Sequence, residues 1–324
     1  MSAPERWAFP PELQPRAEDL AYDLAAALDA VVTVHAKIPE DAFTAGILGT
    51  ERIGSATAIR DDGLLLTIGY LVTEAETIWL TDSRGRVVPG HPLAVDFATG
   101  LALLQPLERL PAKPLPRGSA ASLVPGDPVT VLGRGGLAHS LSAELYAKRE
   151  FAGYWEYLLD EALFTTPLHP EWSGAALVDE RGRLVGVGSL FLQEQSGERE
   201  VRGNMFVPVD ALAPIEGDLV RYGRARRPSR PWLGLYVAEA EHRLGVQGLV
   251  RNGPAFEAGV RLGDVIVAAG GVKVAALADF YRLVWSQGEA GARIPLLLER
   301  GGAPVEVVVR SGNREDFLRR PSLQ

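Results

Sequence analysis

The stretch of sequence that decides the fold is residues 53–72, which read IGSATAIRDDGLLLTIGYLV. It contains two β-rich runs, at residues 55–59 and 64–67, and the residues between them, RDDG, are typical of a tight turn. We therefore expect two neighbouring antiparallel strands here, joined by that turn.

The same pattern continues along most of the chain. From about residue 32 to residue 209, turns with Gly, Asp or Pro separate further β-rich runs at residues 77–80, 101–104, 128–132, 176–178 and 184–187. Many short strands of this kind indicate an antiparallel sandwich or barrel. Residues 16–31 differ, because their apolar residues recur at three- and four-residue spacing, and they predict one amphipathic helix.

A polar segment divides the chain in two. Residues 222–230, YGRARRPSR, combine Gly and Pro with four arginines, and we interpret them as a linker, with a basic docking motif as the less favoured alternative. The sequence thus predicts an N-terminal segment at residues 1–31, a β domain at residues 32–221 and a second domain at residues 231–324. A chain of 324 residues is long enough for two domains with separate cores.

Composition limits the chemistry that is open to this chain. It has no Cys, which excludes disulfides, thiolate nucleophiles and Cys-ligated metals. Its five His are not spaced as a metal pair, so we predict no metal and no cofactor. The net charge of −8 disfavours nonspecific binding of nucleic acid.

Membrane and export signals are missing from the sequence pattern. No run of about 18 apolar residues occurs, and the first residues lack a basic region followed by an apolar one. We therefore expect no membrane span and a cytoplasmic location.

Three motifs follow the linker in order: PWLGL at residues 231–235, GLVRNGPAFEAG at 248–259 and LGDVIV at 262–267. A helix-like stretch at 275–285 and two strand-like runs at 293–298 and 305–309 come after them. This order resembles the PDZ domain of the bacterial type carried by HtrA-family proteases. The resemblance implies an α+β PDZ domain with a C-terminal tail over residues 231–324.

The PDZ resemblance also implies a binding site for peptide C-termini. In such domains the turn at residues 232–235 points N–H groups at the terminal carboxylate, and the following strand pairs with the peptide. The helix would supply a side-chain pocket, although Phe280 and Val284 are equally compatible with core positions. The predicted peptide-binding residues are Trp232, Leu233, Gly234, Leu235, Tyr236, Phe280, Tyr281 and Val284.

Three segments before the linker resemble the trypsin-like domain of HtrA proteases: residues 53–72, VDFATGLALL at 95–104 and LHPEWSGAAL at 168–177. The match implies a double β-barrel. Residue by residue, it puts Tyr70 at the catalytic His, Gly100 at the catalytic Asp and Ser173 at the nucleophile. Glu171 takes the place of the oxyanion Gly.

Each departure from the family's motif has a chemical consequence. A serine nucleophile needs a base, and tyrosine, with an ordinary pKa near ~10, is a poor one at neutral pH. Gly100 has no carboxylate to orient a base, and Glu171 brings negative charge to the site where an oxyanion would form. We therefore expect no catalytic residues in this chain.

Two routes to a rebuilt base stay open. One uses a histidine elsewhere, His35, His139 or His169, the last of which lies four residues before Ser173. The other, less favoured, is a Ser–Lys dyad, for which the chain offers Lys37, Lys113, Lys148 and Lys273.

Our interpretation is a catalytically inactive HtrA-like protein that binds peptide C-termini or unfolded segments as an adaptor, scaffold or regulator. The resemblance further implies protein quality control and a homotrimer, or a mixed oligomer with an active relative. The alternative is an active serine endopeptidase that uses Ser173 with a rebuilt or partner-supplied base. A third reading is a structural subunit whose PDZ domain binds nothing.

Overall fold

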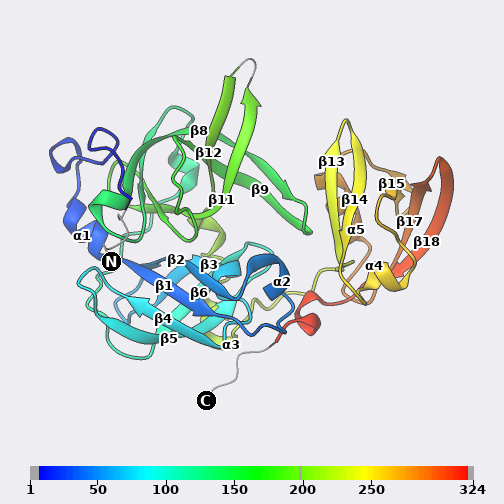
Figure 1. The fold of residues 1–324 in the computed structure, drawn as a ribbon, viewed down its shortest axis with the longest axis horizontal. Coiled ribbons are helices and arrows are strands. Elements are labelled where there is room, and N and C mark those ends of the chain that lie inside the picture. Colours follow the sequence, from blue (N-terminus) through cyan, green and yellow to red (C-terminus); the bar gives the residue numbers. More distant parts are fainter. Residues whose placement is uncertain (1–6, 197–198, 320–324) are drawn as a thin grey trace, which may run out of the picture. The chain divides into compact units, whose positions relative to one another are not determined.

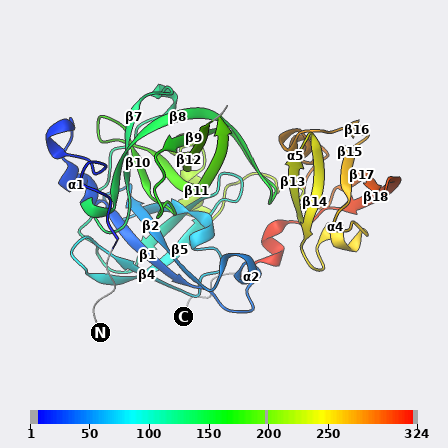
Figure 2. The ribbon, with the colours of Figure 1, turned by 45° about the horizontal axis from the view of Figure 1, so that its top comes forward.

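The computed structural model describes residues 7–196 and 199–319. The chain forms two compact units (Figures 1 and 2). Unit 1 holds the described residues up to Arg149, then Glu161–Ala225 and Arg319. Unit 2 holds Arg226–Leu318 together with Glu150–Asp160, a short piece of the preceding domain's sequence.

The first half of unit 1 is a closed antiparallel barrel with the strand order β1-β2-β3-β6-β5-β4. The strand that follows the RDDG turn, β3, is buried at all four positions, because the barrel interior and the packing around it cover both of its faces. The six strands are β1 (Val31–Lys37), β2 (Glu51–Ala58), β3 (Leu65–Ile68), β4 (Thr77–Thr81), β5 (Val87–Val95) and β6 (Leu101–Pro106).

The second half of unit 1 is another closed barrel, with the order β10-β11-β12-β9-β8-β7. Its core contains the fully buried Phe206, Leu163 and Leu141. The six strands are β7 (Pro128–Leu132), β8 (Ser140–Gly153), β9 (Tyr157–Thr166), β10 (Ala176–Val178), β11 (Leu184–Ser196) and β12 (Arg199–Pro208). These two barrels confirm the predicted trypsin-like double β-barrel.

Short helices lie between and beside the strands of unit 1. They are α1 (Leu24–Asp29), α2 (Ala45–Leu48) and α3 (Glu216–Tyr222). Gly223, with φ +70°, ends α3 in the left-handed conformation that favours glycine.

The prediction of one amphipathic helix over residues 16–31 is wrong. The segment contains a 3-10 helix, Ala17–Asp19, and the separate α1, whose first turn is capped by the Asp23 side chain. Between them, Tyr22 packs on Gly182 and its hydroxyl lies 3.1 Å from Thr130 Oγ1. These long-range contacts outweigh the local helical periodicity.

Unit 2 is an antiparallel sheet with the order β13-β14-β15-β17-β18, and β16 pairs with β15. Its strands are β13 (Leu235–Ala240), β14 (Arg243–Leu249), β15 (Val265–Ala269), β16 (Val272–Lys273), β17 (Arg293–Arg300) and β18 (Ala303–Arg310). The helices α4 (Pro254–Glu257) and α5 (Leu277–Ser286) complete the α+β domain, in which α5 and the two strands that follow it agree with the predicted ones.

The division into units adds one feature to the expected domains. The break between Ala225 and Arg226 falls inside the predicted linker, but the end of the β8–β9 hairpin, Glu150–Asp160, belongs to unit 2. Leu158 from this segment packs in the core of unit 2. Within the described residues, no helix combines the length and the apolar character needed to cross a bilayer.

Candidate functional site

The structure brings Tyr70 and Ser173 together from opposite parts of unit 1. Tyr70 lies in a 3-10 helix, Gly69–Leu71, directly after β3, and Ser173 lies in the loop between β9 and β10. The Tyr70 hydroxyl is 2.8 Å from Ser173 Oγ and 2.8 Å from the carbonyl oxygen of Ser189. Two of the three predicted triad positions therefore meet in space.

The loop that carries Ser173 is held by close backbone contacts. The N–H of Ser55 donates to the carbonyl of Ser173 at 2.8 Å. Gly174 has φ +72°, and a Cβ there would lie 1.9 Å from the carbonyl oxygen of Ser55. Only glycine fits such an approach, so strand β2 fixes the backbone on which Ser173 stands.

The hydrogen-bonding role of Tyr70 follows from its single proton. The carbonyl of Ser189 can only accept, so both contacts are satisfied at once when Tyr70 donates to Ser189 and Ser173 donates to Tyr70. Burial raises the pKa of Tyr70 above its usual range, while the hydrogen bond with Ser173 opposes that shift. The tyrosine is therefore a neutral acceptor, not a base, for the serine proton.

The backbone of Gly100 bonds to the residue before Tyr70. It has φ +77°, and its carbonyl accepts a 2.7 Å hydrogen bond from the N–H of Gly69, the residue before Tyr70. The nearby Asp96 carboxylate accepts from the N–H and hydroxyl of Thr99 at 2.9 and 2.8 Å. The one carboxylate of this turn thus stabilises the turn itself.

Glu171, at the predicted oxyanion position, makes internal contacts through its N–H and its side chain. The N–H of Glu171 donates to His169 Nδ1 at 3.0 Å, and the Glu171 carboxylate pairs with Arg134 and lies 3.2 Å from His139 Nδ1. An oxyanion hole needs its N–H groups free to point at the substrate. Here one of those donors is already used inside the protein.

The histidines considered as replacement bases are placed elsewhere or engaged. His169 is fully buried, its Nε2 lies 2.8 Å from the carbonyl of His139, and burial lowers its pKa. With Nδ1 accepting and Nε2 donating, the ring is neutral and both nitrogens are used. His139 faces Glu171, and His35 lies on β1 with Nε2 4.0 Å from a Glu51 carboxylate oxygen.

The predicted carboxylate-binding turn of unit 2 has the expected geometry, but a residue of the same unit fills it. The N–H groups of Leu233, Gly234 and Leu235 donate to the Glu156 carboxylate at 2.9, 2.7 and 3.0 Å. Gly234 has φ +74°, which lets the three N–H groups converge. Sequence reasoning missed Glu156, whose only signal was an acidic residue in an aromatic turn, YWEY at residues 154–157.

Glu156 is fully enclosed in this position. Burial raises its pKa to about 7, while the hydrogen bonds from the turn and the charge of Arg314 act in the opposite direction. Its backbone has φ +60°, a left-handed conformation that is uncommon for a non-glycine residue.

Most of the remaining predicted peptide-binding residues are buried in unit 2. Phe280 and Val284 lie in the core of unit 2, and Trp232 packs against Phe317 with ring centroids 4.7 Å apart. Tyr281 is also buried, yet its hydroxyl donates to the carbonyl of Gly153 at 2.7 Å and accepts from the N–H of Glu156. Tyr236, on β13, is half-buried.

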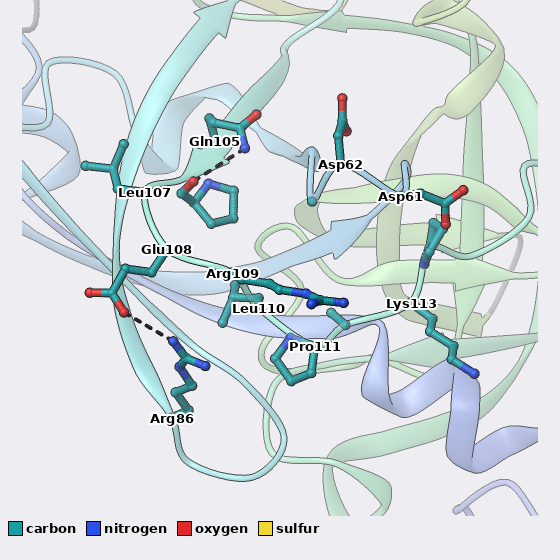
Figure 3. A pocket seen from close by; sticks show the side chains of 14 residues that line it. Asp61, Asp62, Arg86, Gln105, Leu107, Glu108, Arg109, Leu110, Pro111 and Lys113 are labelled. Carbon is teal, nitrogen blue, oxygen red and sulfur yellow. Dashed lines mark hydrogen bonds and ion pairs between the residues drawn. The ribbon is translucent and has the colours of Figure 1, made fainter.

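A surface pocket on the first barrel is lined by none of the predicted site residues, and Figure 3 shows its lining side chains. Its lining mixes both charges, and Arg86 and Glu108 form an ion pair of 3.2 Å across one side. Asp61, Asp62, Arg109 and Lys113 are its other charged lining residues, and three prolines also line it. Within the described residues, no group of three or more His, Asp or Glu side chains is placed to hold a metal.

Family models match both halves of the chain. A trypsin-like peptidase domain matches residues 54–187, and a PDZ domain matches residues 231–310.

Curated relatives match across the two domains. "Protease Do-like 1, chloroplastic" from Arabidopsis thaliana is 26% identical over 291 residues, which cover 82% of this chain and 64% of that protein. "Probable periplasmic serine endoprotease DegP-like" from Pseudomonas putida is 25% identical, with coverage of 82% and 57%. The chain thus spans about three fifths of the length of these relatives, whose names do not support the cytoplasmic expectation.

Solved structures share the fold. "HtrA-type protease AlgW with decapeptide" is 21% identical with a TM-score of 0.53, covering 93% of this chain and 100% of that one. The serine endoprotease from Yersinia pestis is 21% identical with a TM-score of 0.51, covering 91% and 99%. The chain therefore combines a trypsin-like peptidase domain with a PDZ domain and is similar along both to HtrA-type proteases.

Proposed function

We propose that this chain is a catalytically inactive HtrA-like protein that binds polypeptide C-termini or unfolded segments through its PDZ domain, as an adaptor, scaffold or regulator. The observation that carries the proposal is the Tyr70 hydroxyl, which lies 2.8 Å from Ser173 Oγ at the position where an active relative needs an imidazole. The proposal concerns the chain as given, which spans only part of its relatives' length.

Loss of catalysis follows from three separate requirements of acyl transfer. Ser173 meets a neutral phenol instead of a base, and Gly100 supplies no carboxylate to orient one. The N–H of Glu171 is bound to His169, so one oxyanion donor is turned away from substrate. Because each loss alone slows an enzyme by orders of magnitude, restoring one group does not restore the reaction.

The binding half of the proposal rests on β13 and the turn before it. Three N–H groups already coordinate a carboxylate there, which is the chemistry that captures a peptide terminus. β13 stands at the end of the strand order, next to β14, so among the described residues it is an edge strand of the sheet. An extended peptide can add to such an edge through main-chain hydrogen bonds.

The test uses a library of peptides with free C-termini, with the affinities measured by fluorescence anisotropy on the full chain. We expect binders in the micromolar range whose affinity falls at least about tenfold when the terminus is amidated, because an amide NH₂ cannot accept the hydrogen bonds that a carboxylate oxygen accepts from the turn. No binder, or equal binding of the amidated peptides, contradicts the proposal. The same samples, incubated with casein, should yield no cleavage products.

The resemblance also supports an oligomer as a further proposal, either a homotrimer or a mixed assembly with an active relative. Light scattering on the full chain, alone and with such a relative, tests it: a mass of one protomer under both conditions contradicts both assemblies.

A further inference from the structure

The turn between β8 and β9 lies in the peptide-binding position of the PDZ domain. Three main-chain donors, from Leu233, Gly234 and Leu235, hold the Glu156 carboxylate. Two residues earlier, the carbonyl of Tyr154 accepts a 2.9 Å hydrogen bond from the N–H of Val237 on β13. The β8–β9 turn therefore bonds both to the carboxylate-binding turn at residues 233–235 and to the edge strand β13.

The direction and spacing of this segment are those of a bound peptide end. In β-augmentation, main-chain hydrogen bonds to the edge strand give affinity. The terminal carboxylate binds in the turn that leads into that strand. Here a carbonyl bonds to Val237 and a carboxylate enters the turn two residues further along. The Glu156 side chain takes the place of a terminal α-carboxylate, and its left-handed backbone lets the chain return as β9.

Other contacts hold the turn in this position. The Tyr281 hydroxyl bonds to the carbonyl of Gly153 at 2.7 Å and to the N–H of Glu156 at 3.1 Å. At the base of the turn, Arg282 on α5 pairs with Asp160 at 2.8 Å and with Glu150. The Arg282 ion pairs are exposed and contribute little, whereas the contacts of Glu156 and Tyr281 are buried.

The burial of Glu156 and Tyr281 determines whether a ligand carboxylate can enter the turn at residues 233–235. Glu156 and Tyr281 are 8% and 1% exposed, so a second carboxylate cannot enter the turn while Glu156 occupies it. Because the β8–β9 turn is tethered to the domain, it competes at a high effective concentration. The apparent affinity of an external ligand then falls without any change in that ligand's own contacts.

We propose that the β8–β9 turn is a built-in competitor of the PDZ domain, with Glu156 acting as a pseudo-C-terminus that a peptide carboxylate must displace. This inference rests on the proposed peptide-binding function and adds its regulation. Because β8 and β9 continue into the second barrel, displacement of the turn frees the end of a hairpin whose strands belong to that barrel.

The first measurement detects docking without any ligand. Hydrogen exchange on the full chain reports the protection of the N–H groups of Leu233, Gly234 and Leu235. Glu156→Ala should lower their protection at least about tenfold, because three buried donors lose their acceptor. The matched control Glu150→Gln removes only an exposed ion pair with Arg282 and should leave their protection unchanged. Equal protection in wild type and Glu156→Ala overturns the inference.

The second measurement detects competition. A labelled peptide with a free C-terminus, taken from the library above, should bind Glu156→Ala at least about tenfold more tightly than wild type, and Glu150→Gln should bind like wild type. Equal affinity of wild type and Glu156→Ala overturns the inference while peptide binding stands. If neither protein binds any peptide, the proposed function fails, and the exchange data show separately whether the turn is docked.

Discussion

The hydroxyl of Tyr70 lies 2.8 Å from Ser173 Oγ, and the N–H of Ser55 holds the backbone of Ser173 in place. The contact joins two of the predicted triad positions and gives Ser173 a phenol as its hydrogen-bond partner. A phenol of raised pKa accepts the serine proton in a hydrogen bond but does not take it. The barrel around them does not depend on the reaction, because its stability comes from buried strands such as β3.

Restoring the imidazole alone should not restore proteolysis. In Tyr70→His the new base has no carboxylate partner, since Gly100 has no side chain and its φ of +77° strains any replacement. The N–H of Glu171 also stays bound to His169. We expect casein hydrolysis to remain within about tenfold of the wild-type background. Turnover far above that background contradicts the assignment of these positions, provided that both proteins melt at similar temperatures.

The glycine that follows Ser173 should be essential for the fold. Gly174→Ala places a Cβ 1.9 Å from the carbonyl of Ser55 at φ +72°, so we expect a loss of at least about 3 kcal/mol in the free energy of unfolding. The control is Gly217→Ala in α3, where nothing lies within 4 Å and alanine favours the helix by about 1 kcal/mol. Denaturant unfolding should give a lower free energy of unfolding for Gly174→Ala and a higher one for Gly217→Ala than for wild type. An unchanged free energy of unfolding in Gly174→Ala would contradict the prediction.

Docking of the β8–β9 turn should weaken as pH rises. The pKa of Glu156 is about 7 when docked, against an ordinary value of 4.5, so the docked state binds more protons between these values. The contribution of Glu156 protonation to docking is therefore fully present below pH 4.5 and is lost as the pH rises to about 7. Among the groups that face Glu156, Tyr236 and Tyr281 have raised pKa values and stay neutral across this window, while Arg314, whose pKa burial lowers, supplies the facing positive charge.

Hydrogen-exchange protection factors of Gly234 and Leu235 test this dependence, since they already divide out the intrinsic effect of pH. They should fall by about one to two orders of magnitude between pH 5 and pH 8. Glu156→Gln, which does not titrate, should show a flat profile. A rising profile in wild type, or a fall of equal size in Glu156→Gln, runs against the prediction.

Acid should destabilise unit 2 through Asp264. Its carboxylate is 1% exposed and pairs with Arg300 at 2.7 Å, and the hydrogen bonds from Arg300 hold its pKa below the usual range. The stabilisation is present above about pH 4 and is lost as the pH falls through the lowered value. Asp264→Asn should lower the thermal midpoint of unit 2 at pH 7 and flatten its dependence on acid. Equal midpoints for variant and wild type at pH 7 would contradict this role.

Sequence motifs predicted the parts of the structure that depend on local pattern and chain order. The RDDG turn and the short β-rich runs predicted an antiparallel sandwich or barrel, and the resemblance to the trypsin-like domain of HtrA proteases implied the double barrel and put Tyr70 and Ser173 at positions of one site. The helix expected over residues 16–31 failed because the contacts of Tyr22 with the second barrel are long-range. Propensity in a single window carries no information on such contacts.

Two features of the sites depended on tertiary structure alone. The bond from the Glu171 N–H to His169 Nδ1 depends on the conformation of one loop, which residue types do not specify. The docking of Glu156 requires a hairpin to meet a turn that lies 78 residues away along the chain. An acidic residue among aromatics was visible in the sequence, but its partner was not.

The proposed function requires that Ser173 is not a nucleophile in this chain. Intact-mass spectrometry after treatment with a fluorophosphonate tests it most directly, with an active trypsin-like protease as the positive control and Ser173→Ala as the matched variant. We expect no change in the mass of the folded wild-type chain, with or without a bound C-terminal peptide. A stoichiometric adduct that maps to Ser173 and is lost in Ser173→Ala would contradict it.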